Sequence, residues 1–201
     1  MTAKVLKFPW EFYGALTESR LSVVAEALLT VYDSTHTELS SELDDNYTRG
    51  TTTFGRSKNK LIALHKSGVY DWFDLRNTSN DLTCSIDRIP FRFFRDDHEK
   101  PGKKGFWRRN AQDDMFAVED DQPVLFRFVL ERPAGEEDDA SVYFLGFTVS
   151  GQLACEWRHE STVRVLRSVD DSRPVAEEVP SPIVGLKDER ADGKTKDGTG
   201  D

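Results

Sequence analysis

Apolar residues after position 17 follow the spacing of an amphipathic helix. Six of them recur at intervals of three, four or seven residues: Leu21, Val24, Leu28, Tyr32, Leu39 and Leu43. These intervals place the side chains on one helical face, which is the face expected to contact a core. Thr17 or Ser19 would supply the N-cap, and a break is expected near Ser34 and Thr35. The aromatic cluster in residues 1–16 is expected to pack onto the domain as an arm.

The segment Arg49–Arg56, RGTTTFGR, contains two glycines and three threonines. Residues of these types favour irregular backbone, so the segment is predicted to be a loop. Ser57 would then cap a short helix over Lys58–Lys66. Gly68 would end that helix in the left-handed conformation that glycine adopts readily.

The apolar period changes from 3.6 to 2 after residue 68, which indicates strands. The predicted strands are Val69–Leu75, Leu82–Ile86, Ile89–Phe93, Val124–Arg132, Val142–Val149 and Gln152–His159, followed by a short one at Val163–Val165. Turns are predicted at Asn77–Asp81 and at the pair Ser150-Gly151. Pro90 lacks a backbone N–H donor, so its strand is expected either to lie at a sheet edge or to start there.

Helices followed by strands are typical of α+β folds. The sequence therefore predicts N-terminal helices packed on a mostly antiparallel sheet of about six strands. Apolar content falls sharply after about Asp170, and no aromatic residue follows Trp157. We expect one domain over residues 1–169 and a disordered acidic and polar tail over residues 170–201, because such a composition buries too little apolar surface to fold.

Composition sets limits on location and partners. No apolar run approaches the roughly 18 residues that span a bilayer, and the N-terminus lacks the apolar core of a secretory signal, so no membrane association is expected. The two cysteines, Cys84 and Cys155, do not suggest a disulfide framework, which favours the cytoplasm.

The net charge is -9, yet residues 49–112 carry 14 basic against 7 acidic residues. Long-range attraction to nucleic acid should be weak, whereas the basic central segment is compatible with a local anion-binding site.

The segment Arg88–Arg109 combines five large aromatic and eight basic residues in 22 positions. The simpler interpretation is a strand with a core face and a solvated face, followed by a polar loop. The functional interpretation is that arginines and lysines enclose an anion while a ring stacks on a base or inserts into a partner. Eight side chains are candidates for this site: Arg92, Arg95, Lys103, Lys104, Phe106, Trp107, Arg108 and Arg109.

A second basic segment, Arg49–Lys60, could form an anion nest in front of a helix, with Arg56 and Lys58 as ligands. It departs from the nucleotide-binding Walker pattern, because Arg56 follows Gly55 where that pattern requires lysine. A solvated loop with a helix cap is the simpler interpretation. Adjacency of the two basic segments would strengthen the case for an anion site.

Catalytic and metal-binding patterns are sparse. The four histidines are scattered, no Cys-x-x-Cys or His-Glu-x-x-His spacing occurs, and residues 96–99 would hold a cation only loosely, so no metal or cofactor is predicted. The carboxylate-x-Lys spacing of many nucleases occurs only at Asp192 and Lys194, in the predicted tail. An enzyme is therefore not favoured, although a site assembled from distant residues leaves no linear pattern.

Three functions follow as hypotheses. The leading one is a non-enzymatic cytoplasmic binding or regulatory protein that recognises nucleic acid, a nucleotide or another phosphate-bearing ligand through the two basic segments. The second is an acidic adaptor or inhibitor that docks on a nucleic-acid-handling protein through the carboxylates of Glu38–Asp45 and Glu136–Asp139. The third is a nuclease-like or phosphatase-like enzyme whose site is not local in the sequence.

Overall fold

The helices precede the strands in the fold, as predicted. The computed structural model describes residues 6–109, 121–133, 135 and 138–160, all within Met1–Val163, one of two compact units of the chain. Its helices are α1 (Pro9–Phe12), α2 (Glu18–Glu38) and α3 (Asn46–Lys66). Its strands are β1 (Phe73–Asn77), β2 (Thr83–Ile86), β3 (Ile89–Arg95), β4 (Leu125–Glu131), β5 (Ser141–Phe147) and β6 (Leu153–Arg158). The strand expected at Val163–Val165 and the expected tail lie outside the described residues.

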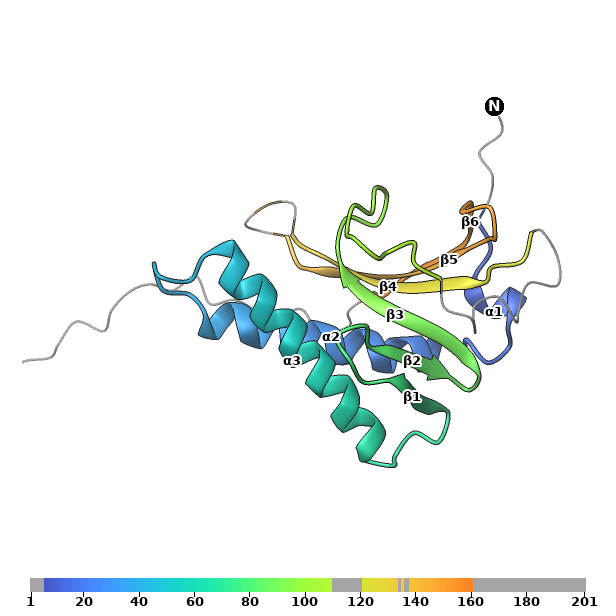
Figure 1. The fold of residues 1–201 in the computed structure, drawn as a ribbon, viewed down its shortest axis with the longest axis horizontal. Helices are drawn as coiled ribbons and strands as arrows, with labels where there is room; N and C mark the ends of the chain where they lie inside the picture. Colours follow the sequence, from blue (N-terminus) through green and yellow to red (C-terminus); the bar gives the residue numbers. More distant parts are fainter. Residues whose placement is uncertain (1–5, 110–120, 134, 136–137, 161–201) are drawn as a thin grey trace, which may run out of the picture. The chain divides into compact units, whose positions relative to one another are not determined.

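The six strands form one sheet in chain order, β1-β2-β3-β4-β5-β6. Neighbouring strands are antiparallel except for β3 and β4, which are parallel. Parallel neighbours need a long crossover, and the chain between β3 and β4 supplies it. Helices α2 and α3 cover one face of this sheet (Figure 1). The predicted α+β fold with a mostly antiparallel sheet is therefore confirmed.

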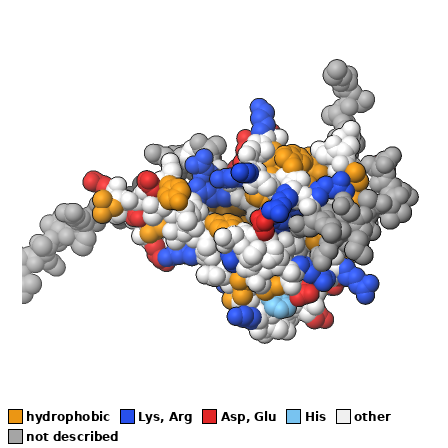
Figure 2. All heavy atoms as spheres, viewed as in Figure 1, with side chains coloured by type: hydrophobic (Ala, Val, Ile, Leu, Met, Phe, Trp, Pro, Cys, Tyr) orange, Lys and Arg blue, Asp and Glu red, His pale blue; other side chains and the backbone are white. Residues whose placement is uncertain are grey.

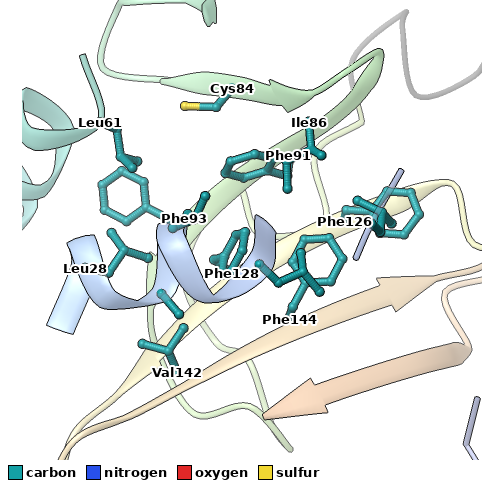
Figure 3. Packing of buried hydrophobic residues seen from close by; sticks show 14 of the residues in the cluster. Leu28, Leu61, Cys84, Ile86, Phe91, Phe93, Phe126, Phe128, Val142 and Phe144 are labelled. Atoms are coloured by element: carbon teal, nitrogen blue, oxygen red, sulfur yellow. The ribbon is translucent and has the colours of Figure 1, made fainter. Parts of the chain in front are cut away.

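Phenylalanines form the centre of the core beneath the helices. Phe91 and Phe93 of β3 both point toward the helices, since alternate residues of a strand share a face. They meet phenylalanines of β4 and β5 and leucines of α2 and α3 (Figure 3): Phe126, Phe128, Phe144, Leu28 and Leu61. The rings of Phe91 and Phe128 meet edge to face, with centroids 5.0 Å apart. These two aromatic residues of the first basic segment thus belong to the core.

Helix α2 begins where the sequence indicates. Thr17 is its N-cap, and its hydroxyl oxygen accepts a hydrogen bond from the Arg20 backbone N–H. The predicted break is wrong, because the helix continues through the fully buried Thr35 and ends at Glu38. Leu43, which is 91% exposed, does not extend its apolar face. None of the described helices is both long and apolar enough to cross a membrane.

The loop predicted over Arg49–Arg56 is wrong, because this segment forms the first half of α3. Asp45 caps the helix by accepting a 2.7 Å hydrogen bond from the Thr48 N–H. Residues four apart form the buried stripe of the helix: Thr53, Ser57 and Leu61. Apolar periodicity does not reveal this stripe, since two of its members carry hydroxyl groups, and Ser57 is a buried helix residue and not a cap. Gly68 follows the helix with a φ of +66°, as predicted.

The largest difference between the predicted and the observed strand boundaries is at the start of β1. Strand β1 begins at Phe73 and not at Val69, which is 71% exposed. Pro90 is the second residue of β3, which lies in the interior of the sheet between β2 and β4. Of the two predicted positions for this proline, the structure therefore shows the strand start and not the sheet edge. The hairpin between β5 and β6 turns at Gly151, whose φ is +81°, as the Ser150-Gly151 pair predicts.

The opposite face of the sheet carries a second, smaller core. Its buried members are Phe106, Val124, Leu125, Val129, Tyr143, Leu145 and Phe147. Phe106 comes from residues 96–109, the described part of the β3–β4 connection that follows β3 directly, called the β3–β4 loop below. This loop therefore packs on the face that the helices leave open.

The two cysteines are core residues. Cys84 and Cys155 are buried and form no disulfide. Burial raises the pKa of each thiol to about 12. Both thiols therefore stay protonated at neutral pH, and a protonated thiol is a poor nucleophile and a poor metal ligand.

Candidate functional site

A groove lies between the first half of α3 and the end of β3, and its two parts have different linings. The aromatic hollow, of about 460 Å³, includes Tyr47, Gly50, Phe54, Phe93, Phe94 and Lys104. The basic hollow, of about 710 Å³, includes His36, Arg49, Asp96, Asp97, Glu131 and Arg132. Asn46, Arg95 and Lys103 line both hollows, which together are called the α3–β3 groove. Figure 2 shows Lys and Arg side chains gathered between α3 and the end of β3.

Arg95, the last residue of β3, lies where the two hollows meet. Its Nη1 atom is buried and has no hydrogen-bond partner in the described part of the structure. The guanidinium lies against α3 at Gly50, where an added Cβ atom would come within 3.2 Å of both Nη1 and Nη2. Glycine at this helix position therefore makes room for the arginine. A buried donor without a partner costs about 1–3 kcal/mol, so an acceptor that reaches this guanidinium would be bound favourably.

Two further arginines lie near Arg95. Burial, then the charge of Arg132 and less strongly that of Arg49, lowers the pKa of Arg95. The Arg49 guanidinium donates to the carbonyl oxygen of Leu39 over 3.3 Å. Within the described residues, none of these three arginines forms an ion pair. The groove thus holds three positive charges, and a bound anion would offset the repulsion that Arg132 and Arg49 exert on Arg95.

The carboxylates of the basic hollow are engaged by other groups. Asp96 accepts a 2.7 Å hydrogen bond from the backbone N–H of Lys103. Asp97 accepts two more from backbone N–H groups that follow it in the loop, and these bonds lower the pKa of its carboxyl group. Glu131 lies 2.8 Å from Nδ1 of His98. These carboxylates therefore hold the β3–β4 loop in place and do not pair with the arginines.

The same carboxylates include the best metal-ligand geometry of the described residues. Asp97, His98 and Glu131 each offer a ligand atom within 4.8 Å of the others, and mixed imidazole and carboxylate ligands suit ions such as Zn²⁺ or Mn²⁺. The His98–Glu131 contact and the backbone hydrogen bonds to Asp97 already explain where these side chains lie. The cluster is the feature closest to the alternative hypothesis of a phosphatase-like enzyme.

Two exposed rings of α3 line the aromatic hollow. Tyr47 is 77% exposed and Phe54 is 38% exposed, and their separation of seven residues places them on one side of the helix. Phe54 stacks on Phe93 of β3, with ring centroids 5.4 Å apart and an interplanar angle of 25°. Exposed rings beside clustered arginines are typical of surfaces that bind bases and other planar groups.

The structure brings the two predicted basic segments together, since α3 forms one wall of the groove and β3 with its loop forms the other. Four of the residues predicted to bind a ligand line it: Arg92, Arg95, Lys103 and Lys104. The other predicted pair on α3, Arg56 and Lys58, lines neither hollow. Arg56 instead forms a 2.6 Å ion pair with Glu38 of α2. Only the start of the second basic segment, Arg49–Lys60, reaches the groove.

Arg92 and Arg108 share one carboxylate. Nη2 of Arg92 lies 2.8 Å from Asp81, and Nη1 of Arg108 lies 2.9 Å from the other oxygen of the same group. Arg92 is buried, and its second terminal nitrogen donates to the carbonyl oxygen of Gly105. The two arginines therefore fasten the β3–β4 loop to the sheet, which leaves them less available to a ligand than the sequence indicates.

The loop aromatics lie outside the groove. Phe106 has no exposed surface and belongs to the second core, so it is not accessible to a ligand. Trp107 is 47% exposed and packs edge to face on Phe147, with centroids 4.8 Å apart. Arg109 is exposed and lines neither hollow. The rings that the sequence suggests for base stacking are thus replaced at the groove by Tyr47 and Phe54.

Arg127 is a further residue that sequence reasoning missed. It lies on β4 opposite Arg92 in the parallel register and is only 1% exposed. Its guanidinium donates three hydrogen bonds of 2.8–2.9 Å to backbone carbonyl oxygens, those of Phe106, Phe126 and Arg108. Two of these carbonyls belong to the β3–β4 loop. Arg127 therefore anchors the loop that forms one wall of the groove.

Three carboxylates of the first acidic segment, Glu38–Asp45, serve the local fold. Glu38 pairs with Arg56, Asp44 accepts hydrogen bonds from Ser41, and Asp45 caps α3. In the second segment, Asp138 and Asp139 are exposed, while residues 136–137 lie outside the described part of the chain. Docking through these carboxylates stays a prediction.

Comparisons with protein-family models, with curated proteins and with solved structures found no match. The chemistry of the groove itself indicates what it can bind. That chemistry consists of a partly buried arginine whose buried Nη1 atom has no hydrogen-bond partner among the described residues, two more arginines without ion pairs among the same residues, and a neighbouring aromatic hollow.

Proposed function

We propose that the protein binds a phosphate-bearing ligand in the α3–β3 groove and acts as a binding protein. The observation that carries the proposal is the guanidinium of Arg95, which is partly buried, has no hydrogen-bond partner at Nη1 and lies close to Arg49 and Arg132. Arginine suits this role because its planar fork donates two parallel hydrogen bonds to phosphate oxygens. The exposed Lys103 and Lys104 add mobile positive charge at the rim.

The arrangement of Arg95, Arg49 and Arg132 does not stabilise the fold. Like charges close together raise the free energy of the folded state, and burial of an unsatisfied donor raises it further. Most buried donors in folded proteins have a hydrogen-bond partner, so a buried donor without one calls for an explanation such as a bound ligand. Binding of an anion would relieve both penalties at once.

Inorganic pyrophosphate, titrated calorimetrically into the full chain, is a suitable probe. We expect saturable binding to one site, with an affinity that falls as salt is raised. In the double variant Arg49→Met/Arg132→Met the affinity should fall by roughly tenfold or more, because each charge-assisted hydrogen bond contributes about 1.5–3 kcal/mol.

A matched variant separates a local site from general charge. Arg88→Met/Arg158→Met removes the same charge from two exposed arginines that line neither hollow. It should leave pyrophosphate affinity within about twofold of the wild type, because exposed charges beyond a Debye length of about 8 Å are screened. Equal losses in the two double variants, or no binding by the wild type, would refute the proposal.

A further inference from the structure

The two parts of the α3–β3 groove require different ligand chemistry. The aromatic hollow is formed by Tyr47, Phe54 and Phe93, whereas the basic hollow is formed around Arg49 and Arg132. Arg95 lines both parts. A ligand that fills the groove therefore needs a planar apolar group at one end and negative charge at the other.

The aromatic hollow suits a planar group. The ring of Phe54 is fixed from one side by stacking on Phe93, yet it stays 38% exposed to the hollow side and solvent. Tyr47, on the same side of α3 but nearer its N-terminus, is 77% exposed. The amide side chains of Asn46 and Asn80 also line this hollow, and such groups can donate to and accept from the edge of a base.

Overall charge favours a small ligand over a long polyanion. The chain has a net charge of -9, so its field repels nucleic acid beyond the groove. The two hollows together are lined by six basic and four acidic side chains, a local excess of positive charge. Volumes of about 460 and 710 Å³ are in the range of small-molecule sites.

We infer that the groove binds a nucleotide, an inference that rests on the proposed phosphate site and specifies its ligand. The base lies in the aromatic hollow against Phe54 and Tyr47. The phosphates lie in the basic hollow, where Arg95 binds the phosphate nearest the base and Arg49 and Arg132 bind the outer one.

The test compares three kinds of probe on the full chain: pyrophosphate, the nucleoside adenosine, and the diphosphates of adenosine, guanosine, cytidine and uridine. At least one diphosphate should bind roughly tenfold or more tightly than pyrophosphate, because stacking adds to the phosphate contacts. Phe54→Leu keeps an apolar contact with Phe93 but removes the ring. It should lower diphosphate affinity roughly tenfold and leave pyrophosphate affinity unchanged.

The control is Trp107→Leu, which removes an exposed ring outside the groove and should change neither affinity. If pyrophosphate binds but no diphosphate binds more tightly, the nucleotide inference fails and the phosphate site stands. If no probe binds, both fail. A single-stranded oligonucleotide that binds roughly tenfold or more tightly than every mononucleotide would overturn the inference in favour of a nucleic-acid ligand.

Discussion

Replacing Arg127 with methionine should lower the free energy of unfolding by about 3 kcal/mol or more. The substitution leaves three carbonyl oxygens without their donor, those of Phe106, Phe126 and Arg108, and each unsatisfied buried group costs about 1–3 kcal/mol. Methionine fills much of the same volume, so the loss reports on hydrogen bonds more than on a cavity. Because two of the carbonyls belong to the β3–β4 loop, the loop should also become sensitive to proteases.

Urea unfolding and limited proteolysis measure the two effects. Arg127→Lys keeps the charge but cannot reproduce three donors in one plane, so it too should be destabilised. Arg158→Met serves as the control, since Arg158 is exposed on the same sheet and donates one hydrogen bond to Ser141. Its stability should stay within about 0.5 kcal/mol of the wild type. A wild-type unfolding curve for Arg127→Met would show that the anchoring role is wrong.

Replacing Arg95 with methionine should affect binding and stability in opposite directions. Affinity for pyrophosphate should fall roughly 10- to 100-fold, because a charge-assisted hydrogen bond is worth about 1.5–3 kcal/mol. Stability should equal or exceed that of the wild type, since the variant removes a buried donor without a partner and the repulsion from Arg49 and Arg132. If Arg95 served only the fold, its replacement would instead lower the stability of the protein.

Calorimetric titration and urea unfolding of the same preparations test this pair of effects. Gly50→Ala is the matched variant that keeps every charge, because its Cβ atom would crowd the Arg95 guanidinium at 3.2 Å. It should weaken binding, whereas Gly55→Ala in the same helix, with nothing within 4 Å of the added atom, should not. A stable Arg95→Met protein with wild-type affinity would exclude Arg95 from the site.

The fold class followed from the change of apolar period near residue 68, and most strands were recognisable. Only the second half of helix α3 was predicted, over Lys58–Lys66, because the buried stripe of the helix contains Thr53 and Ser57, whose hydroxyl groups interrupt an apolar pattern. Asp45 was the available signal, since it stands as an N-cap directly before the helix. Once α3 is recognised, the seven-residue spacing of Tyr47 and Phe54 places both rings on one side of it.

The site was only partly predictable for a different reason. Arg95, Lys103 and Lys104 were identified from local composition. Arg132 reaches the groove because β4 runs parallel to β3, which sets the ends of both strands side by side. No local pattern predicts that pairing. Likewise, the pairing of Arg92 and Arg108 with Asp81 depends on how the loop folds back over the sheet.

The position of a bound anion tests the central claim most directly. Crystals of the full chain soaked in tungstate, a heavy analogue of phosphate, would reveal that position by anomalous diffraction. We predict a tungsten peak in the α3–β3 groove within hydrogen-bonding reach of Arg95 and beside Arg49 and Arg132. Tungstate bound elsewhere while the groove stays empty would contradict the proposed function.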